Sequence, residues 1–162
     1  IIRRPDALAD KSHDWWVRGR LSRRVADGGH AGAVLQPKSS AQVCTILEWA
    51  QRTRTPVVPF GLGSGVCGAV QAQGDQVVLD MSGMNRILEV NETSLTVVAQ
   101  PGVRGSDFEH ALAARGYTMG HFPQSIDLST LGGWCSTRAA CLCKIEMSGF
   151  PQSRNVLLGW AG

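Results

Sequence analysis

The sequence of 162 residues is long enough for about one domain with a buried core. Hydrophobic residues make up 43% of it and charged residues 18%, which is typical of globular proteins and excludes a disordered chain. No apolar run reaches the roughly 20 residues of a membrane helix, and the N-terminus lacks the apolar stretch of a signal peptide. We therefore expect a cytoplasmic protein without a membrane span.

The net charge of +3 is concentrated at the N-terminus. Residues 1–24 carry seven basic and three acidic side chains, namely Arg3, Arg4, Lys11, Arg18, Arg20, Arg23 and Arg24 against Asp6, Asp10 and Asp14. A nucleic-acid-binding domain usually spreads its basic residues over one face, so no nucleic-acid partner is expected. We predict a solvated basic arm at residues 1–29, with Trp15 and Trp16 packed on the following domain. A phosphate-binding arm is the alternative.

The five cysteines are Cys44, Cys67, Cys135, Cys141 and Cys143. Their number is odd and no CxxC motif is present, so neither a disulfide framework nor a zinc site is expected. We predict reduced, partly buried thiols and no metal.

The first half of the chain predicts a strand at 33–36, a helix and a second strand at 57–59. Ser39 and Ser40 offer an N-cap for the helix. Its apolar stripe has helical spacing and consists of Val43, Ile46, Leu47 and Ala50.

Three short apolar runs at 77–80, 87–90 and 95–99 then predict consecutive strands in a meander. A helix capped by Ser106 and Asp107 is expected to run through Phe108, Ala111, Leu112 and Ala113 and to end near Gly116 as its C′ residue. Residues 120–133 are predicted to form a loop. This order of elements indicates a mixed α+β domain.

The densest glycine cluster follows the strand at 57–59 and spans residues 61–68. Gly63, Gly65 and Gly68 spell GxGxxG, but no helix can begin there before the next strand, which argues against a Rossmann fold. A protein kinase is excluded because no lysine follows for 75 residues, and no P-loop sequence occurs. Backbone N–H groups of clustered glycines can nevertheless form a nest for a phosphate. A plain tight connection is the alternative.

A second loop of small polar residues follows about 60 positions later, with Ser125, Ser129, Thr130, Gly132 and Gly133. Two such loops could hold the two phosphates of one pyrophosphate. A surface Ω-loop is the alternative.

Four segments resemble the FAD-binding domain of the vanillyl-alcohol oxidase/p-cresol methylhydroxylase (PCMH-type) flavoprotein superfamily. Residues 56–68 resemble its first FAD loop, residues 78–87 its strand and LDLSxMNRI segment, and residues 99–103 the turn before its helix. Residues 120–140 are similar to alkyldihydroxyacetonephosphate synthase and its bacterial relatives. The resemblance covers roughly residues 30–140.

The resemblance implies an α+β, PCMH-type FAD-binding domain at 30–140, with the first subdomain and part of the second, and with FAD between them. The first loop would hold the pyrophosphate through Pro59, Phe60, Gly61, Leu62, Gly63, Ser64, Gly65 and Val66. The second loop would contact the cofactor through Gln124, Ser125, Asp127, Leu128, Ser129, Thr130, Gly132 and Gly133. Thr137, Arg138, Ala139 and Ala140 would line the flavin.

The sequence departs from the family at several positions. Leu62 replaces a usual glycine and Gly65 a frequent serine. Ser64 stands where covalent members carry a flavin-linking histidine, so non-covalent FAD is expected. None of the four histidines matches a catalytic histidine of the family, and we interpret His121 as a packing or loop residue; no catalytic residue is predicted.

After residue 140 the family pattern fails, so a divergent, poorly packed tail is expected at 141–162, in a truncated chain. Its exposed apolar surface would favour self-association. The predicted function is FAD binding as part of an FAD-dependent oxidoreductase, or of an alkylglycerone-phosphate synthase-like flavoenzyme, that acts on a small-molecule substrate. The alternatives are a non-catalytic remnant without cofactor and a basic-arm binding module.

Overall fold

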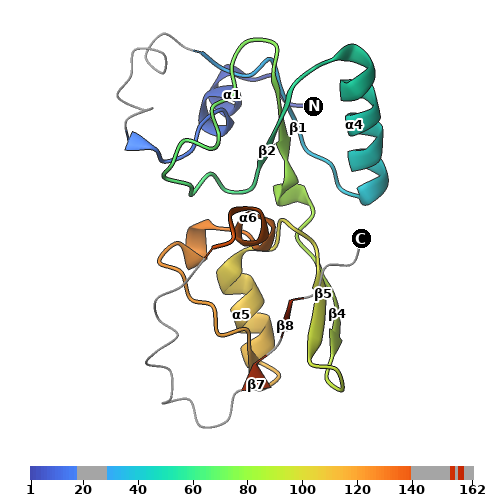
Figure 1. The fold of residues 1–162 in the computed structure, drawn as a ribbon, viewed down its shortest axis with the longest axis vertical. Coiled ribbons are helices and arrows are strands. Elements are labelled where there is room, and N and C mark those ends of the chain that lie inside the picture. Colours follow the sequence, from blue (N-terminus) through green and yellow to red (C-terminus); the bar gives the residue numbers. More distant parts are fainter. Residues whose placement is uncertain (18–28, 140–153, 156, 159–162) are drawn as a thin grey trace. The chain divides into compact units, whose positions relative to one another are not determined.

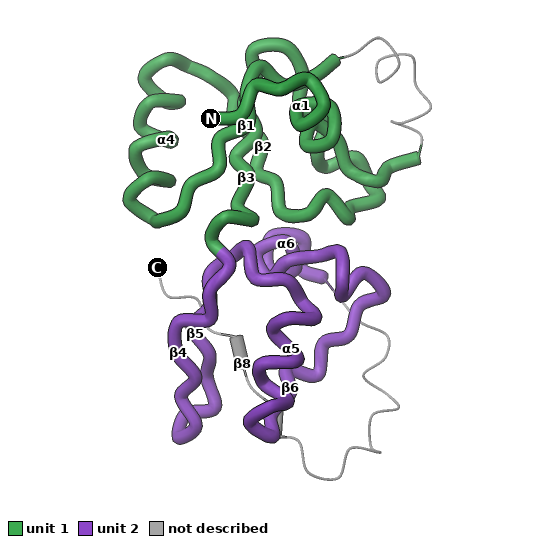
Figure 2. Tube along the Cα trace, turned by 180° about the vertical axis from the view of Figure 1, so that it is seen from behind, with its two compact units in different colours: residues 1–84 green, residues 85–162 purple. Residues whose placement is uncertain are grey.

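The structure, a computed structural model, describes residues 1–17, 29–139, 154–155 and 157–158 (Figure 1). The chain divides into two units, residues 1–84 and 85–162, which Figure 2 shows in different colours. Each unit has its own strands and its own buried core. Among the described residues, no helix is long and apolar enough to cross a membrane.

Unit 1 is built on a parallel sheet of three strands, β1 (Ala33–Leu35), β2 (Val57–Phe60) and β3 (Val77–Asp80), in the order β1-β3-β2. Every residue of β1 and β3 is buried. Such strands need apolar side chains on both faces, which explains the apolar sequences of β1 and of residues 77–79 in β3. The three strands were predicted from sequence to within a residue.

Helix α4 (Ser40–Thr53) covers one face of this sheet, beside β1 in Figure 1. The hydroxyl of Ser39 accepts a hydrogen bond from the Gln42 N–H at 3.3 Å, as expected for the N-cap. Arg54, in the left-handed conformation, ends the helix. The side chains that pack on the sheet are Val43, Ile46 and Trp49. Leu47 was predicted in this stripe but is 46% exposed, because the face that contacts the sheet turns through Trp49 instead.

The other face of the sheet packs against the N-terminal residues. Side chains alternate in a strand, so Val34 and Val78 point away from α4 and join a second core with Phe60. Ile2 forms an antiparallel bridge with Val34, and Leu8 of helix α1 (Pro5–Lys11) packs on the same core. Residues 2–14 are therefore part of unit 1, and the expectation of a solvated arm is wrong for them. Arg18, Arg20, Arg23 and Arg24 lie outside the described residues.

Unit 2 contains an antiparallel hairpin of β4 (Ile87–Asn91) and β5 (Thr96–Ala99). Two short strands from the predicted tail pair in parallel with earlier strands. β8 (Leu157–Leu158) joins β5, and β7 (Arg154–Asn155) joins β6 (Tyr117–Thr118). The rest of the predicted tail, residues 141–153, 156 and 159–162, lies outside the described residues.

The predicted three-strand meander is wrong, because β3 pairs with β1 and β2 in unit 1 rather than with β4. Both edges of β3 are already occupied by parallel neighbours, which leaves no backbone groups for an antiparallel hairpin. The 3-10 turn η1 (Met81–Gly83) follows it, with the Asp80 carboxylate accepting from the Ser82 N–H. Of the three strands in the predicted meander, β4 and β5 alone form a hairpin.

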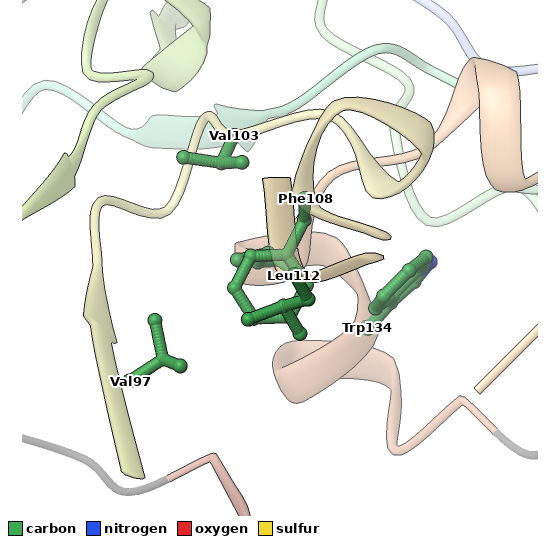
Figure 3. Close-up of a cluster of buried hydrophobic side chains, with 6 residues drawn as sticks. Val97, Val103, Phe108, Leu112 and Trp134 are labelled. Atoms are coloured by element: carbon green, nitrogen blue, oxygen red, sulfur yellow. The ribbon is translucent and has the colours of Figure 1, made fainter. Parts of the chain in front are cut away.

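The core of unit 2 lies between the hairpin and the helices α5 (Gly105–Ala113) and α6 (Leu131–Thr137) (Figure 3). Its members are buried apolar side chains, namely Val97, Val103, Phe108, Leu112, Leu131 and Trp134. Phe108 and Leu112 lie one helical turn apart on α5 and are fully buried.

Helix α5 begins at a position other than the predicted one. α5 begins at Gly105 with Arg104 as N-cap, so the Ser106–Asp107 cap is wrong. Gly105 is required at the start because a Cβ there would lie 2.3 Å from the Trp134 ring. Gly116 follows the C-cap Ala114 by two residues rather than one.

The predicted loop at 120–133 contains a 3-10 turn, η2 (Ile126–Leu128), and the beginning of α6. Thr130 is the N-cap of α6, and its hydroxyl accepts from the Gly133 N–H at 3.3 Å. Two consecutive glycines disfavour a helix locally, and for that reason the sequence did not predict it. Packing of Leu131 and Trp134 into the core stabilises the helix instead.

The neighbouring glycines of α6 provide a matched test of packing. A Cβ on Gly132 would lie 2.7 Å from Pro101 Cβ and 2.9 Å from its carbonyl oxygen, whereas one on Gly133 meets only Thr130 Oγ1 at 3.4 Å. We expect Gly132→Ala to lower the free energy of unfolding by about 2 kcal/mol through overpacking. Gly133→Ala should be neutral or up to about 1 kcal/mol more stable, because alanine favours a helix. Urea unfolding of both variants measures this, and equal effects would contradict the packing of α6 on Pro101.

Candidate functional site

The glycine-rich segment lies between β2 and β3, where residues 61–69 form a loop. Gly63 has a φ of 72°, in the left-handed region that favours glycine. A Cβ at this position would also lie 2.9 Å from the Phe60 ring beneath it. A residue with a side chain would therefore be strained at this position.

None of the backbone N–H groups of residues 61–69 donates a hydrogen bond to another described residue. The Ser64 hydroxyl likewise has no described partner. Two carbonyl groups of the loop, by contrast, are bonded: Gly65 accepts from the Trp15 N–H and Gly68 from the Gln71 side chain. A glycine-rich loop with such a run of unpaired backbone donors is suited to bind an anion.

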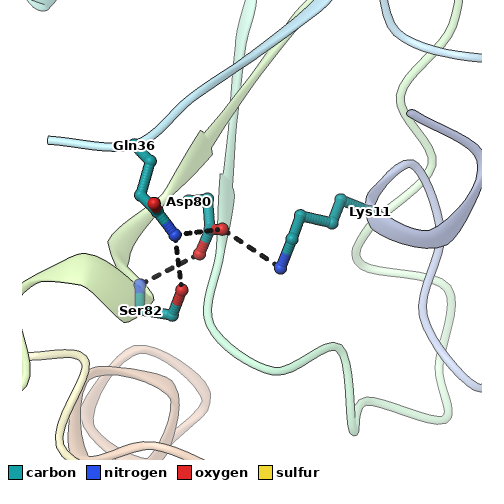
Figure 4. Close-up of polar contacts among 4 residues, drawn as sticks. All are labelled: Lys11, Gln36, Asp80 and Ser82. Atoms are coloured by element: carbon teal, nitrogen blue, oxygen red, sulfur yellow. Dashed lines mark hydrogen bonds and ion pairs between the residues drawn. The ribbon is translucent and has the colours of Figure 1, made fainter. Parts of the chain in front are cut away.

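A buried ion pair lies at the same end of the sheet (Figure 4). Asp80 is the register partner of Phe60, so it ends β3 beside the beginning of the loop. Its side chain is fully buried, and the Lys11 Nζ lies 3.1 Å from Oδ2, which also accepts from the Gln36 side-chain amide at 3.1 Å. The ammonium group of Lys11 lies 4.9 Å from the centre of the Phe60 ring as well. Lys11 thus neutralises Asp80 and contacts the ring on which Gly63 rests.

In the second loop, two of the three predicted hydroxyl groups, those of Ser129 and Thr130, have structural partners. Ser129 Oγ donates to the Ser125 carbonyl and accepts from the Trp134 indole N–H, both at 2.7 Å. The hydroxyl of Thr130 caps α6. The backbone N–H groups of Gln124, Ser125 and Asp127 have no acceptor among the described residues. The N–H groups of His121, Ser129 and Thr130 and the Ser125 hydroxyl likewise have no partner among the described residues.

The other predicted residues of unit 2 differ in exposure and role. Gly132 packs against Pro101, and Ala139 packs against the core. The Thr137 hydroxyl donates to the Gly133 carbonyl at 2.8 Å. Leu128 is 57% exposed, and Arg138 is exposed with a φ of 51° at the end of α6. Ala140 lies outside the described residues.

His121 lies at the beginning of the second loop, with its ring edge-on to Trp134 and 4.6 Å between centroids. Its Nε2 is buried and has no hydrogen-bond partner in the part of the chain that the structure describes. Burial lowers the pKa of His121, so the ring is neutral at neutral pH. This geometry fits the packing role that we interpreted from sequence.

No sequence motif pointed to Glu109, a buried acid on α5. Its carboxylate accepts from the Thr118 hydroxyl at 2.8 Å and from the Met119 N–H at 3.1 Å, which ties β6 to the helix. Burial raises the pKa of Glu109, and these hydrogen bonds oppose that rise.

The described cysteines and acids form no metal site. Cys44, Cys67 and Cys135 are free thiols, and no cluster of metal-binding side chains occurs among the described residues. Cys44 and Cys67 are exposed, so the expectation of partly buried thiols is wrong for these two. Cys141 and Cys143 lie outside the described residues.

Residues 31–148 match the family model described as an FAD binding domain. The chain belongs to this family. Among curated relatives, it is 36% identical over 115 residues to alkyldihydroxyacetonephosphate synthase of Caenorhabditis elegans, covering 68% of this chain and 19% of that protein. It is 36% identical over 131 residues to the same enzyme of Trypanosoma brucei brucei, covering 78% and 21%. The glycolate oxidase subunit GlcD of Bacillus subtilis is 36% identical over 101 residues, covering 62% and 22%.

Solved structures confirm the predicted PCMH-type α+β fold. A structure of alkyldihydroxyacetonephosphate synthase matches with a TM-score of 0.73 and 27% identity, over 82% of this chain and 25% of that one. p-Cresol methylhydroxylase with substrate bound matches with a TM-score of 0.70 and 17% identity, over 86% and 26%, and supports the fold alone. This FAD-binding domain thus spans about a fifth of the length of the curated relatives that it matches.

The ion pair under the loop predicts a large effect of removing its cation. Lys11→Met would leave the fully buried Asp80 carboxylate without a counter-charge. We expect the free energy of unfolding to fall by about 3 kcal/mol, at the low end for a buried pair because the Lys11 side chain is 21% exposed. Lys38→Met removes the same charge from an exposed position and should change it little. Urea unfolding compares the two, and equal losses would contradict a specific role of Lys11.

The lowered pKa of His121 predicts a pH dependence. The stabilisation from burying the neutral His121 ring is fully present above pH 6.5, the pKa of the side chain in the unfolded protein. It is lost as the pH falls through the lower pKa of the folded protein. Between neutral pH and about pH 5, wild type should lose more unfolding free energy than His121→Gln. The control is His110→Gln, at an exposed position on α5, which should follow wild type. If wild type and His121→Gln lost the same unfolding free energy over this pH range, burial of the His121 ring would not cause the pH dependence.

Proposed function

We propose that this chain binds FAD non-covalently and that the loop at residues 61–69 holds the pyrophosphate. The observation that carries the proposal is the run of backbone N–H groups with no acceptor among the described residues, in a chain of the FAD-binding family. Of the predicted first-loop residues, Gly61, Leu62, Gly63, Ser64, Gly65 and Val66 offer such N–H groups. Pro59 has none and Phe60 is buried, so these two support the loop instead.

The second loop contributes less in this proposal than its sequence suggests. We assign cofactor contacts to the backbone N–H groups of Gln124, Ser125 and Asp127. The hydroxyls of Ser129 and Thr130 hold the loop and α6 in shape. Thr137, Arg138, Ala139 and Ala140 remain proposed neighbours of the flavin by family resemblance. Ser64, which cannot link to a flavin as a histidine does, supports non-covalent binding.

FAD supplies redox chemistry through its isoalloxazine ring, and a protein supplies binding and orientation. We propose that this domain serves an FAD-dependent oxidoreductase, or an alkylglycerone-phosphate synthase-like flavoenzyme, with a small-molecule substrate. The named relatives support this assignment, and the chain spans about a fifth of their length. Within that function, we assign residues of this chain to cofactor binding alone.

A pair of glycines in the same backbone conformation tests the loop. Gly63 and Gly74 both have positive φ, 72° and 60°, so alanine at either position costs about 1–2 kcal/mol in backbone strain. Gly63 lies within the run of unpaired N–H groups at 61–69, whereas Gly74 lies outside it. A Cβ on Gly74 would meet no atom within 4 Å. We expect Gly63→Ala to weaken FAD binding about tenfold or more, because one charge-assisted hydrogen bond would be lost. Gly74→Ala should leave FAD binding unchanged. Titration of the purified chain, followed by flavin fluorescence, measures both dissociation constants.

Urea unfolding of the same variants separates binding from stability. If wild type shows no binding of added FAD, the proposal fails and a remnant without cofactor is favoured. If both variants bind as wild type does, FAD binding stands but the assignment of the loop is wrong. Retention on heparin that salt abolishes, without FAD binding, would favour a basic-arm binding module.

A further inference from the structure

Residues 12–16 run alongside the glycine-rich loop and are bonded to it at several backbone positions. The Trp15 N–H donates to the Gly65 carbonyl at 2.8 Å, and the Asp14 N–H donates to the Val70 carbonyl at 3.2 Å. The Ser12 carbonyl accepts from the Ala72 N–H at 2.7 Å. These residues precede the segment 31–148 that matches the family model, so the family resemblance assigns them no role.

The carboxylate of Asp14 lies at the centre of these contacts. Asp14 is only 3% exposed, and it has no basic partner among the described residues. Its Oδ1 accepts from the Trp16 N–H at 3.1 Å and its Oδ2 from the Val70 N–H at 3.4 Å. A Cβ on Gly65 would lie 3.1 Å from Oδ2, so the carboxylate lies directly against the loop backbone.

A buried carboxylate without a cation costs free energy unless hydrogen bonds compensate for it. Asp14 obtains that compensation from backbone N–H groups on both sides, one in its own segment and one at the end of the loop. The ring of Trp16, which follows, packs so closely on Gly68 that a Cβ there would lie 2.8 Å from it. The carboxylate therefore joins the N-terminal segment to the loop.

The loop itself has few internal bonds, because its N–H groups at 61–69 donate to no described residue. Such a loop holds its donors in one arrangement only if something outside it fixes the backbone. A binding site that is preorganised loses less conformational entropy when its ligand binds. Contacts to Gly65, Gly68 and Val70 from residues 14–16 supply that restraint.

We infer that Asp14 is a positioning residue of the proposed FAD-binding loop: its carboxylate holds the loop backbone so that the unpaired N–H groups are arranged for the pyrophosphate. This inference rests on the proposed FAD binding. Asp14 itself does not contact the cofactor. Its negative charge would repel a phosphate if charge alone mattered, so the sign of the effect distinguishes positioning from electrostatics.

The test compares three variants of the full chain, Asp14→Ala, Asp14→Asn and Asp10→Ala. Asp10 lies on α1, is exposed, and carries the same charge, so Asp10→Ala is the matched control. Asparagine retains one acceptor oxygen but offers an N–H₂ group in place of the other, so one of the two bonds survives. The measurements are the dissociation constant for FAD, amide hydrogen exchange of residues 61–70 without FAD, and the urea midpoint.

We expect Asp14→Ala to raise the dissociation constant for FAD about tenfold, the effect of losing hydrogen bonds to a charged group. Within residues 61–70, exchange of the Val70 amide should become faster in the same variant, because its N–H donates to Asp14. Asp14→Asn should fall between Asp14→Ala and wild type, and Asp10→Ala should match wild type in both measurements. If Asp14→Ala loses its cooperative urea transition, the comparison of Asp14→Asn with Asp10→Ala carries the test.

Unchanged FAD affinity and unchanged loop exchange in the Asp14 variants would overturn the inference while leaving FAD binding intact. Tighter binding by Asp14→Asn would overturn it too, because the charge would then act by repulsion. Faster exchange without an affinity change would show that Asp14 orders the loop but not for FAD, which also overturns it. Absence of FAD binding by wild type would instead overturn the proposed function on which the inference rests.

Discussion

Strand β3 is paired in parallel along both edges, and every residue in it is buried. Much of unit 1 depends on this constraint. The register places Phe60 and Asp80 side by side at the carboxyl ends of β2 and β3. A carboxylate at the end of a fully buried strand needs a counter-charge, and Lys11 provides it from the end of α1. That contact brings the following residues, 12–16, to the loop that leaves β2.

The site in unit 1 thus depends on contacts made at a distance along the chain. Lys11 contacts the ring of Phe60, and that ring lies under Gly63. On another side of the loop, Asp14 and the backbone of Trp15 hold Val70 and Gly65. With its N–H groups bonded to no described residue, the loop has backbone donors available to a ligand. The N-terminal segment and the loop therefore meet beside the face of the sheet opposite α4, where we propose the anion site.

In unit 2, close packing uses small residues, and the sequence suggested two of them, Ser129 and Gly132, for binding. Gly105 and Gly132 leave room for the Trp134 ring and for Pro101, and Ser129 accepts the hydrogen bond of the indole N–H. Small polar residues in a loop are compatible with either ligand contact or tight packing, and their sequence alone does not distinguish the two. The tertiary contacts show which of these groups remain available.

The sequence by itself determined the strands of unit 1, helix α4, the β4–β5 hairpin and the glycine-rich loop, because turn residues and hydrophobic periodicity act over a few neighbouring residues. The family motifs predicted the FAD-binding fold. Only the tertiary structure decided that β3 joins β1 and β2 and that α6 forms across two glycines. It also decided that Lys11 and Asp14 lie beside the glycine-rich loop and the residue that precedes it. The carboxylate of Asp14 and the N–H of Val70 are 56 positions apart, so no local pattern could indicate their contact. Burial created the need for such partners, and burial arises only when the units are folded.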